Sequence, residues 1–164
     1  MIKLSEIENK YKDYLVDEDK LKEILVTPKS KTVWDLEEGD VYYYLNDMGR
    51  ICTGAFALVS KDYNRRGCCN AFLTIEEAQF ESDRRECESV LLKYGRRTFK
   101  YQKPNWFLYF SYVENRVGVG CNWNVSHPGL IYFDSEELAR KAMESFTEYR
   151  LKKYVLGEEP KIEE

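Results

Sequence analysis

Two stretches, "NAFLTIEEAQ" (residues 70–79) and "LIYFDSEELARK" (residues 130–141), contain the same pattern, F-x-[S/T]-x-E-x-A. Its positions are Phe72, Thr74, Glu76 and Ala78 in the first stretch, and Phe133, Ser135, Glu137 and Ala139 in the second. A Ser or Thr directly before acidic residues is an N-cap signal, because its side-chain oxygen accepts from a free helix amide. The pattern predicts two short strands, each with a core-facing phenylalanine, followed by capped helices.

The sequence around these junctions predicts an internal repeat. Alternating aromatic and β-branched residues with turn signals place a pair of strands before each junction, around residues 41–59 and 106–125. The loop between the second and third predicted strands is five residues shorter in the second copy than in the first. Arg50 to Phe72 is 22 positions, whereas Arg116 to Phe133 is 17. The predicted fold class is α+β, with two pseudo-repeated ββ-β-α units and antiparallel sheets. A single such unit is too small to bury its sheet face alone.

The predicted organisation has five segments. The N-terminus begins with a capping-box pattern, Ser5 to Glu8, and apolar residues at helical spacing follow it. The segments are an N-terminal helical segment and linker (1–30), a first ββ-β-α unit (31–95), a basic-aromatic linker (96–105), a second unit (106–156) and an acidic tail (157–164). The N-terminal segment is a candidate dimerisation or docking element.

Finer features follow from periodicity and turn residues. The first repeat helix should bury one face and stop at Gly95; that face comprises Cys87, Val90, Leu91 and Tyr94. The second should bury Leu138, Ala142, Phe146 and Tyr149. "SKDYNRRG" (60–67) reads as a loop, and residues 71–73 as a short third strand.

Composition and charge limit the classes of function. The chain has 164 residues, 43% of them apolar, and a net charge of −4. Residues 41–110 carry 11 basic and 8 acidic side chains, or +3, while the flanking segments 1–40 and 111–164 carry −4 and −3. An acidic chain with a basic middle does not have the charge that is typical of a general nucleic-acid binder. The N-terminus lacks the apolar region of a signal peptide, so reduced thiols and a cytoplasmic location are expected.

Candidate catalytic and metal-binding residues are few. His127 is the sole histidine and precedes a proline in a turn-like segment. Cys68 and Cys69 follow Arg65 and Arg66, whose charge favours a thiolate, but adjacent cysteines are poorly spaced for zinc and have no nearby histidine base. Gly118 and Gly120 open no helix, so they mark a bulge or a close backbone approach instead. We therefore predict no catalytic residue, cofactor or metal.

The strongest binding candidate is "GRRTFKYQKPNW" (95–106), in which cations alternate with aromatic rings and no acidic residue occurs. Cations for phosphates and rings for bases suit single-stranded nucleic acid, and arginines equally suit an acidic protein surface. The alternative is a linker whose rings pack inward. The predicted partner-binding residues are Arg65, Arg66, Arg96, Arg97, Lys100, Tyr101, Lys103 and Trp106.

The stretch "VWDLEEGDVYYYLNDMGRI" (33–51), followed by "NAFLTIEEA" (70–78), resembles a family of small proteins encoded by phages and prophages of Gram-positive bacteria. Its pattern is W-x-L-x-x-G-D-x-Y-Y, then G-x-I, an arginine-rich loop and G-N-x-F-x-T-x-E-E-A. The matching residues are Trp34, Leu36, Gly39, Asp40, Tyr43, Gly49, Ile51, Arg66, Gly67, Asn70, Phe72, Thr74, Glu76, Glu77 and Ala78. Cys68 and Cys69 are inserted before the asparagine, which implies a wider loop.

The resemblance covers residues 30–95 well and 104–154 more weakly, and it carries no catalytic motif. It implies a non-enzymatic accessory protein that binds a host protein or ribonucleoprotein, in its sharpest form an anti-defence inhibitor of a CRISPR effector. The alternative is a single-stranded nucleic-acid-binding module that uses residues 96–106. No membrane partner is expected, and a homodimer is a further option.

Overall fold

The computed structural model describes residues 30–158 of the chain. A boundary between two units falls between Lys31 and Thr32, so the elements below all belong to the second unit. The predicted N-terminal helical segment lies, up to residue 29, outside the described residues, as does the acidic tail beyond residue 158. No helix within residues 30–158 has the length and apolar character needed to cross a membrane.

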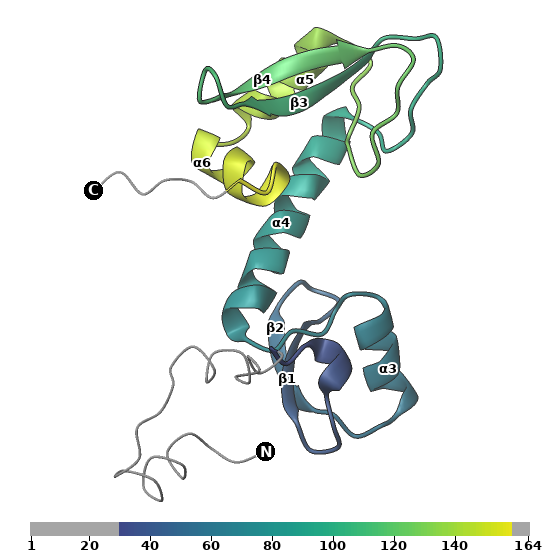
Figure 1. The fold of residues 1–164 in the computed structure, drawn as a ribbon, viewed down its shortest axis with the longest axis vertical. Coiled ribbons are helices and arrows are strands. Elements are labelled where there is room, and N and C mark those ends of the chain that lie inside the picture. The colour runs from purple at the N-terminus through teal and green to yellow at the C-terminus, as the bar shows by residue number, and fades with distance from the viewer. Residues whose placement is uncertain (1–29, 159–164) are drawn as a thin grey trace, which may run out of the picture. The chain divides into compact units, whose positions relative to one another are not determined.

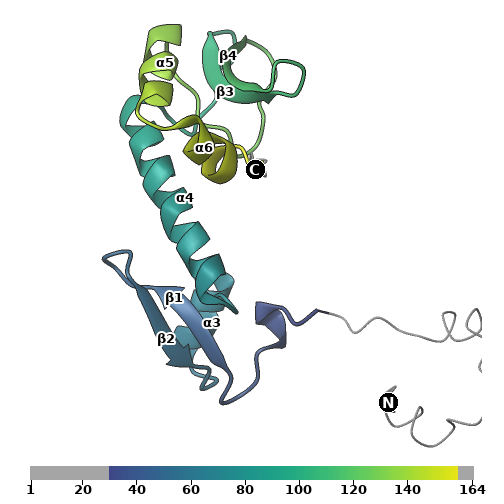
Figure 2. The same ribbon diagram turned by 90° about the vertical axis from the view of Figure 1, so that its left-hand side faces the viewer.

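The described residues form an α+β fold with two small antiparallel sheets of two strands each (Figure 1). Strand β1 (Val41–Leu45) pairs with β2 (Ile51–Ala55), and β3 (Asn105–Ser111) pairs with β4 (Arg116–Asn122). The helices are α3 (Ser60–Gly67), α4 (Ile75–Tyr94), α5 (Glu136–Glu144) and α6 (Glu148–Arg150), with a 3-10 turn η1 (Val33–Asp35) and a π-helix η2 (Leu151–Val155). Helix α4 contacts β1, β2, α5 and η2, and Figure 2 shows it running between the two hairpins.

Both helix caps predicted at the two junctions are confirmed. The Thr74 hydroxyl accepts from the Glu77 amide at 3.2 Å, and the Glu77 carboxylate accepts from the Thr74 amide, which completes a capping box. Ser135 caps α5 by accepting from the Leu138 amide at 3.2 Å. Each junction therefore satisfies a helix amide that otherwise has no partner.

The caps give a stability prediction. Thr74→Ala and Ser135→Ala should each lower the free energy of unfolding by about 0.5–2 kcal/mol, because each leaves a helix amide without its acceptor. Urea unfolding followed by circular dichroism measures the change. Thr74→Ser and Ser135→Thr retain the acceptor and serve as controls, so equal losses in both pairs would contradict the capping role.

The predicted third strands are shorter in the structure than in the prediction. Phe72 forms a single bridge to Tyr43, and Phe133 a single bridge to Trp106. Both bridges carry two backbone hydrogen bonds of 2.8–3.1 Å. The chain leaves each bridge directly into an extended helix cap, so the strand pairing stops after one or two residues.

The segment "SKDYNRRG" was predicted as a loop and is helix α3. The N-cap Val59 contributes no side-chain hydrogen bond, and the sequence has no apolar periodicity. What holds the helix is tertiary: its buried Asp62 bonds to Tyr42 of β1 and to the backbone before the helix. Strand β2 also ends early, at Ala55, because Leu58 adopts a left-handed backbone with φ of 57° and turns the chain.

Two separate clusters of buried residues form the core. The first comprises Leu36, Tyr42, Phe56 and Ala71, and the second Leu91, Leu108, Val117, Phe133, Ala139, Ala142 and Leu151. Phe133 faces its core as predicted, with 1% exposure. Phe72 is only half-buried, because its pairing with Tyr43 puts it on the face opposite the buried Tyr42. Its neighbour Ala71 takes the core position instead.

The ends of the two main helices differ in how well they were predicted. Helix α4 buries Cys87 and Leu91 and stops at Gly95, as expected. There is no room for a side chain at this position, because a Cβ at Gly95 would lie 2.7 Å from the Ile131 side chain and 2.9 Å from the Tyr132 carbonyl oxygen. Helix α5 ends at Glu144, and a new helix starts after Thr147, so Tyr149 is exposed rather than buried.

Candidate macromolecule-binding surface

The structure places the predicted binding residues in two groups. Arg65 and Arg66 lie at the end of α3, against the β1–β2 hairpin. The residues of 96–106 lie between α4 and β3, against the segment that leads into α5. The two groups contact different parts of the fold, so they do not form one continuous site.

Arg65 is part of a buried polar network. Its Nη1 donates to the Tyr42 hydroxyl at 2.8 Å, and that hydroxyl donates to Asp62 Oδ1 at 2.7 Å. Asp62 Oδ2 accepts from the Ala57 amide at 2.9 Å. The Tyr42 hydrogen bond, with help from backbone amides and Arg65, holds the pKa of Asp62 below its usual value of 3.8 despite burial. Arg65 is therefore a structural residue that fixes α3 to the hairpin.

Arg66 occupies a different environment, made of aromatic rings. Its guanidinium lies 5.0–5.3 Å from the ring centroids of Trp34, Phe56 and Tyr63. Trp34 is 65% exposed and Tyr63 42% exposed, so the edge of this cluster reaches solvent. Planar guanidinium groups stack well on such rings, and this arrangement leaves Arg66 partly exposed at the end of α3.

Two cations of the basic-aromatic stretch bind an aspartate directly before α5. Lys100 Nζ lies 2.8 Å from Asp134 Oδ1, and Arg96 Nε lies 3.0 Å from the same oxygen. The hydrogen bond from Lys100 and, to a smaller degree, the one from Arg96 hold the pKa of the Asp134 carboxyl below its usual range. Arg96 also donates to Asn105, a fully buried residue whose amide group closes the loop by bonding to the Lys100 and Lys103 carbonyls.

The other residues of this stretch have distinct surroundings. Arg97 pairs with Glu88 at 2.5 Å, and Trp106 packs against the second core cluster. Phe99 packs edge-on against the buried Tyr132. Tyr101 is 69% exposed, and Lys103 is exposed beside it. Of the eight predicted binding residues, Tyr101 and Lys103 are thus the two best placed to meet a partner, whereas Trp106 is a core residue.

A surface that the prediction missed lies on the solvent-facing side of β3–β4. Phe107 pairs with Gly120, and Tyr109 with Gly118. The rings lie against these glycines: a Cβ at Gly118 would be 2.8 Å from the Tyr109 ring, and one at Gly120 would be 3.0 Å from the Phe107 ring. The sequence predicted a bulge or a close backbone approach at Gly118 and Gly120; the structure instead has regular pairing there, with aromatic side chains lying against both glycines. The missed signal was the alternation of aromatic residues in one strand opposite glycines in the next.

Further exposed apolar side chains lie in the loops at one end of this hairpin. Trp123 is 53% exposed and Val125 52% exposed, and the Trp123 carbonyl accepts from the Gln102 amide at 3.1 Å. That bond joins the turn holding Tyr101 to the end of β4. We call the set Tyr101, Lys103, Phe107, Tyr109, Trp123 and Val125 the aromatic surface.

The groups considered for chemistry are separated from one another. Cys68 and Cys69 are exposed at the end of α3, while the His127 ring lies 6.0 Å from that of Phe107 in the other half of the fold. Cys87 is buried, and burial raises the pKa of its thiol, which disfavours the thiolate. Within residues 30–158, no three His, Cys, Asp or Glu side chains gather as metal ligands.

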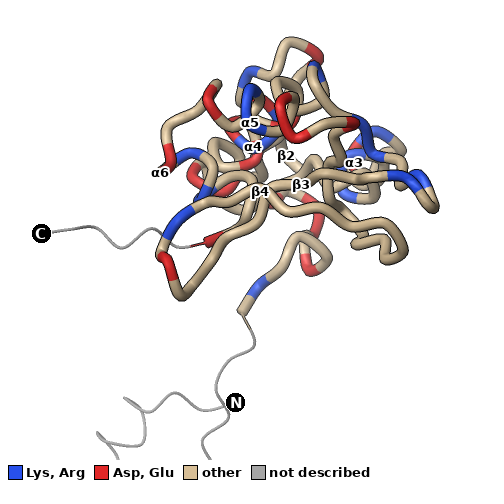
Figure 3. The backbone as a smooth tube through the Cα atoms, turned by 90° about the horizontal axis from the view of Figure 1, so that it is seen from above, with Lys and Arg blue, Asp and Glu red and all other residues tan. Residues whose placement is uncertain are grey.

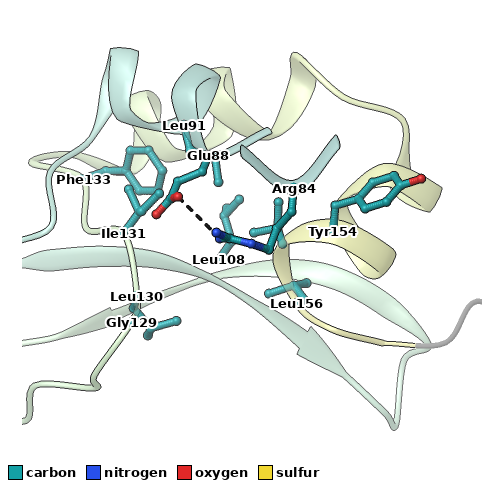
Figure 4. A pocket seen from close by; sticks show the side chains of 11 residues that line it. Arg84, Glu88, Leu91, Leu108, Gly129, Leu130, Ile131, Phe133, Tyr154 and Leu156 are labelled. Carbon is teal, nitrogen blue, oxygen red and sulfur yellow. Dashed lines mark hydrogen bonds and ion pairs between the residues drawn. The ribbon is translucent and has the colours of Figure 1, made fainter. Parts of the chain in front are cut away.

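A small cavity lies between α4, β3, the segment 129–131 and η2 (Figure 4). Its volume is about 70 Å³, and most of the residues that line it are apolar. Arg84 and Glu88 form its polar wall, with 3.4 Å between Nη1 and Oε2, and Arg84 also pairs with Glu81 at 2.7 Å. Sites for ligands of drug or cofactor size are typically about 300–1,000 Å³. This cavity is therefore a gap in the core beneath the π-helix.

Comparison with known proteins adds no relative to this description. No family model matches the chain, and no curated protein or solved structure is significantly similar to it.

Proposed function

We propose that the chain is a non-enzymatic binding protein that attaches to a nucleic-acid-handling complex of a bacterial host. The observation that carries this proposal is the aromatic surface. Tyrosine and tryptophan are enriched at protein interfaces, and grouped exposed apolar side chains mark interaction sites. Tyr101, Trp123 and Val125 are each more than half exposed, and a hydrogen bond from the Gln102 amide to the Trp123 carbonyl joins the two loops that carry them.

The resemblance to small phage and prophage proteins supports the sharper form of the proposal. Accessory proteins of this kind act by binding host machinery, and an anti-defence inhibitor of a CRISPR effector is the form that we propose here. Such an inhibitor works in the host cytoplasm and requires no cofactor.

We also propose that the two halves are copies of one ββ-β-α unit. Each hairpin accepts one bridge from a phenylalanine, and each phenylalanine precedes an N-cap by two residues. The copies differ in their loops, because the first loop holds helix α3 and the second, shorter loop holds none in the described chain.

The proposal predicts inhibition at equal stoichiometry. Expression of the chain in a Gram-positive host with an active CRISPR system should raise the plating efficiency of a targeted phage. A titration of the purified chain into the effector should then reach full inhibition near one equivalent, because a binder is consumed in the complex. The measurement is residual DNA cleavage against the molar ratio.

Two results would count against this function. Inactivation of many equivalents of effector by one chain would indicate an enzyme. Unchanged plating efficiency, together with no host protein enriched by the tagged chain, would remove the anti-defence role. Cys68→Ser and Cys69→Ser are the control variants and should keep full inhibition.

A further inference from the structure

Each hairpin has one face on the side of its bridging phenylalanine and an opposite face. The two hairpins differ in what covers this opposite face. In the first hairpin this face carries Tyr42 and Tyr44, and α3 lies over it. The Arg65 guanidinium sits 3.3 Å from the centroid of the Tyr44 ring. A planar group is therefore stacked on the aromatic face of the first hairpin by the chain itself.

In the second hairpin the same kind of face carries Phe107 and Tyr109, and helix α5 lies on the opposite side (Figure 2). Tyr109 is 41% exposed and Phe107 is half-buried, with a ring-centroid distance of 6.4 Å. Gly118 and Gly120 let both rings lie close to the strands, as Gly54 does beneath Tyr42 at 3.4 Å. The two ring planes are tilted by 58° to each other, so a flat group can stack on one ring at a time, and we call this pair of rings the platform.

The charge around the platform favours an anionic partner. The segment 95–134, which contains both strands, has five basic residues (Arg96, Arg97, Lys100, Lys103, Arg116) and two acidic ones (Glu114, Asp134). Arg97 is paired with Glu88 of α4 and Arg116 with Glu114, so the net charge of this segment together with Glu88 is +2 in a chain of −4. Within the strands, Arg116 is the single charged residue, and Figure 3 shows β3 and β4 otherwise free of charge. Lys100 and Arg96 share one carboxylate, that of Asp134, so these three side chains together carry one net positive charge.

We propose that this face of β3–β4, with Tyr101 and Trp123 at its end, binds single-stranded nucleic acid by base stacking on Phe107 and Tyr109. Flat aromatic rings flanked by cations are the arrangement by which proteins bind unpaired bases without reading their sequence. A double helix keeps its bases stacked inside and cannot offer them to the platform. The inference rests on the proposed function, since it names the chemistry that this surface contacts in the host complex.

The test is fluorescence anisotropy with labelled oligo(dT) and oligo(U) of about 12 nucleotides, since one such site covers about 4–16. The full chain should bind both at low salt, with affinity that falls as salt rises. Tyr109→Ala should weaken binding about tenfold or more, whereas Tyr109→Phe should keep it. Tyr149→Ala is the matched control, because Tyr149 is similarly exposed on α6, and it should have no effect.

A second variant changes the platform without substituting any aromatic residue. In Gly118→Ala the added methyl meets only the outer end of the Tyr109 ring, which can swing away without disturbing the core. We expect unchanged thermal unfolding and several-fold weaker oligonucleotide binding. Lys103→Ala should instead reduce the slope of affinity against salt concentration by about one unit.

The outcomes are distinguishable from those for the proposed function. No anisotropy change at low salt, or equal losses in Tyr109→Ala and Tyr149→Ala, overturns the inference. If Tyr109→Ala loses effector inhibition while no oligonucleotide binds, the face docks protein, and the binding function stands without nucleic acid. Equal affinity for duplex and single strand, unaffected by Tyr109→Ala, assigns the binding to charge alone and also overturns it.

Discussion

Replacement of Phe133 by alanine is expected to lower the free energy of unfolding by about 3–5 kcal/mol. Phe133 is 1% exposed and sits in the larger core cluster, where its backbone also bridges Trp106. The truncation removes buried apolar area and leaves a cavity, and both effects destabilise the folded state. Urea unfolding followed by tryptophan fluorescence measures the loss.

Phe72→Ala is the matched control for that experiment. Phe72 holds the same place before its N-cap and makes the same kind of bridge, but its side chain is only half-buried. We expect a smaller loss, of about 1–2 kcal/mol, in proportion to the smaller buried area. Equal losses in the two variants would contradict the different burial of the two rings.

The second large effect is expected at Asp62. Asp62→Ala removes the acceptor for the buried Tyr42 hydroxyl and for the Ala57 amide, and it leaves Arg65 without its carboxylate. Uncompensated buried polar groups and charges are costly, so the free energy of unfolding should fall by about 3 kcal/mol. Asp47→Ala, at an exposed turn of the same hairpin, should cost little. A similar loss in both variants would argue against the network.

The same network makes stability depend on pH in a defined direction. Hydrogen bonds lower the pKa of Asp62 in the folded chain, whereas the unfolded chain has the ordinary value of about 3.9. The contribution is therefore complete above about pH 5 and is lost as the pH falls through the folded-state pKa. The stability difference between the parent chain and Asp62→Asn should shrink in acid. A difference that widens below pH 4 would contradict this assignment.

Local signals in the sequence determined the starts of α4 and α5 and the two strand pairs. The hydroxyls of Thr74 and Ser135 bond to amides in their own helical turns, so helix capping can be predicted without knowledge of the fold. The buried face of α4 and its stop at Gly95 followed from helical spacing in the same way. The α+β class followed from these elements.

Tertiary contacts decided the rest, because they join residues that are distant in the sequence. Helix α3 has little local support and forms where Asp62 can bond to Tyr42, 20 positions away. The exposure of Phe72 depends on which residue of β1 it pairs with, and side-chain spacing cannot give that register. Asp134 binds Arg96 and Lys100 across 38 and 34 positions, so the charge of the basic stretch could not be judged from that stretch alone. The face of Phe107 and Tyr109 became visible only when pairing set them over Gly120 and Gly118 and left α5 on the other side.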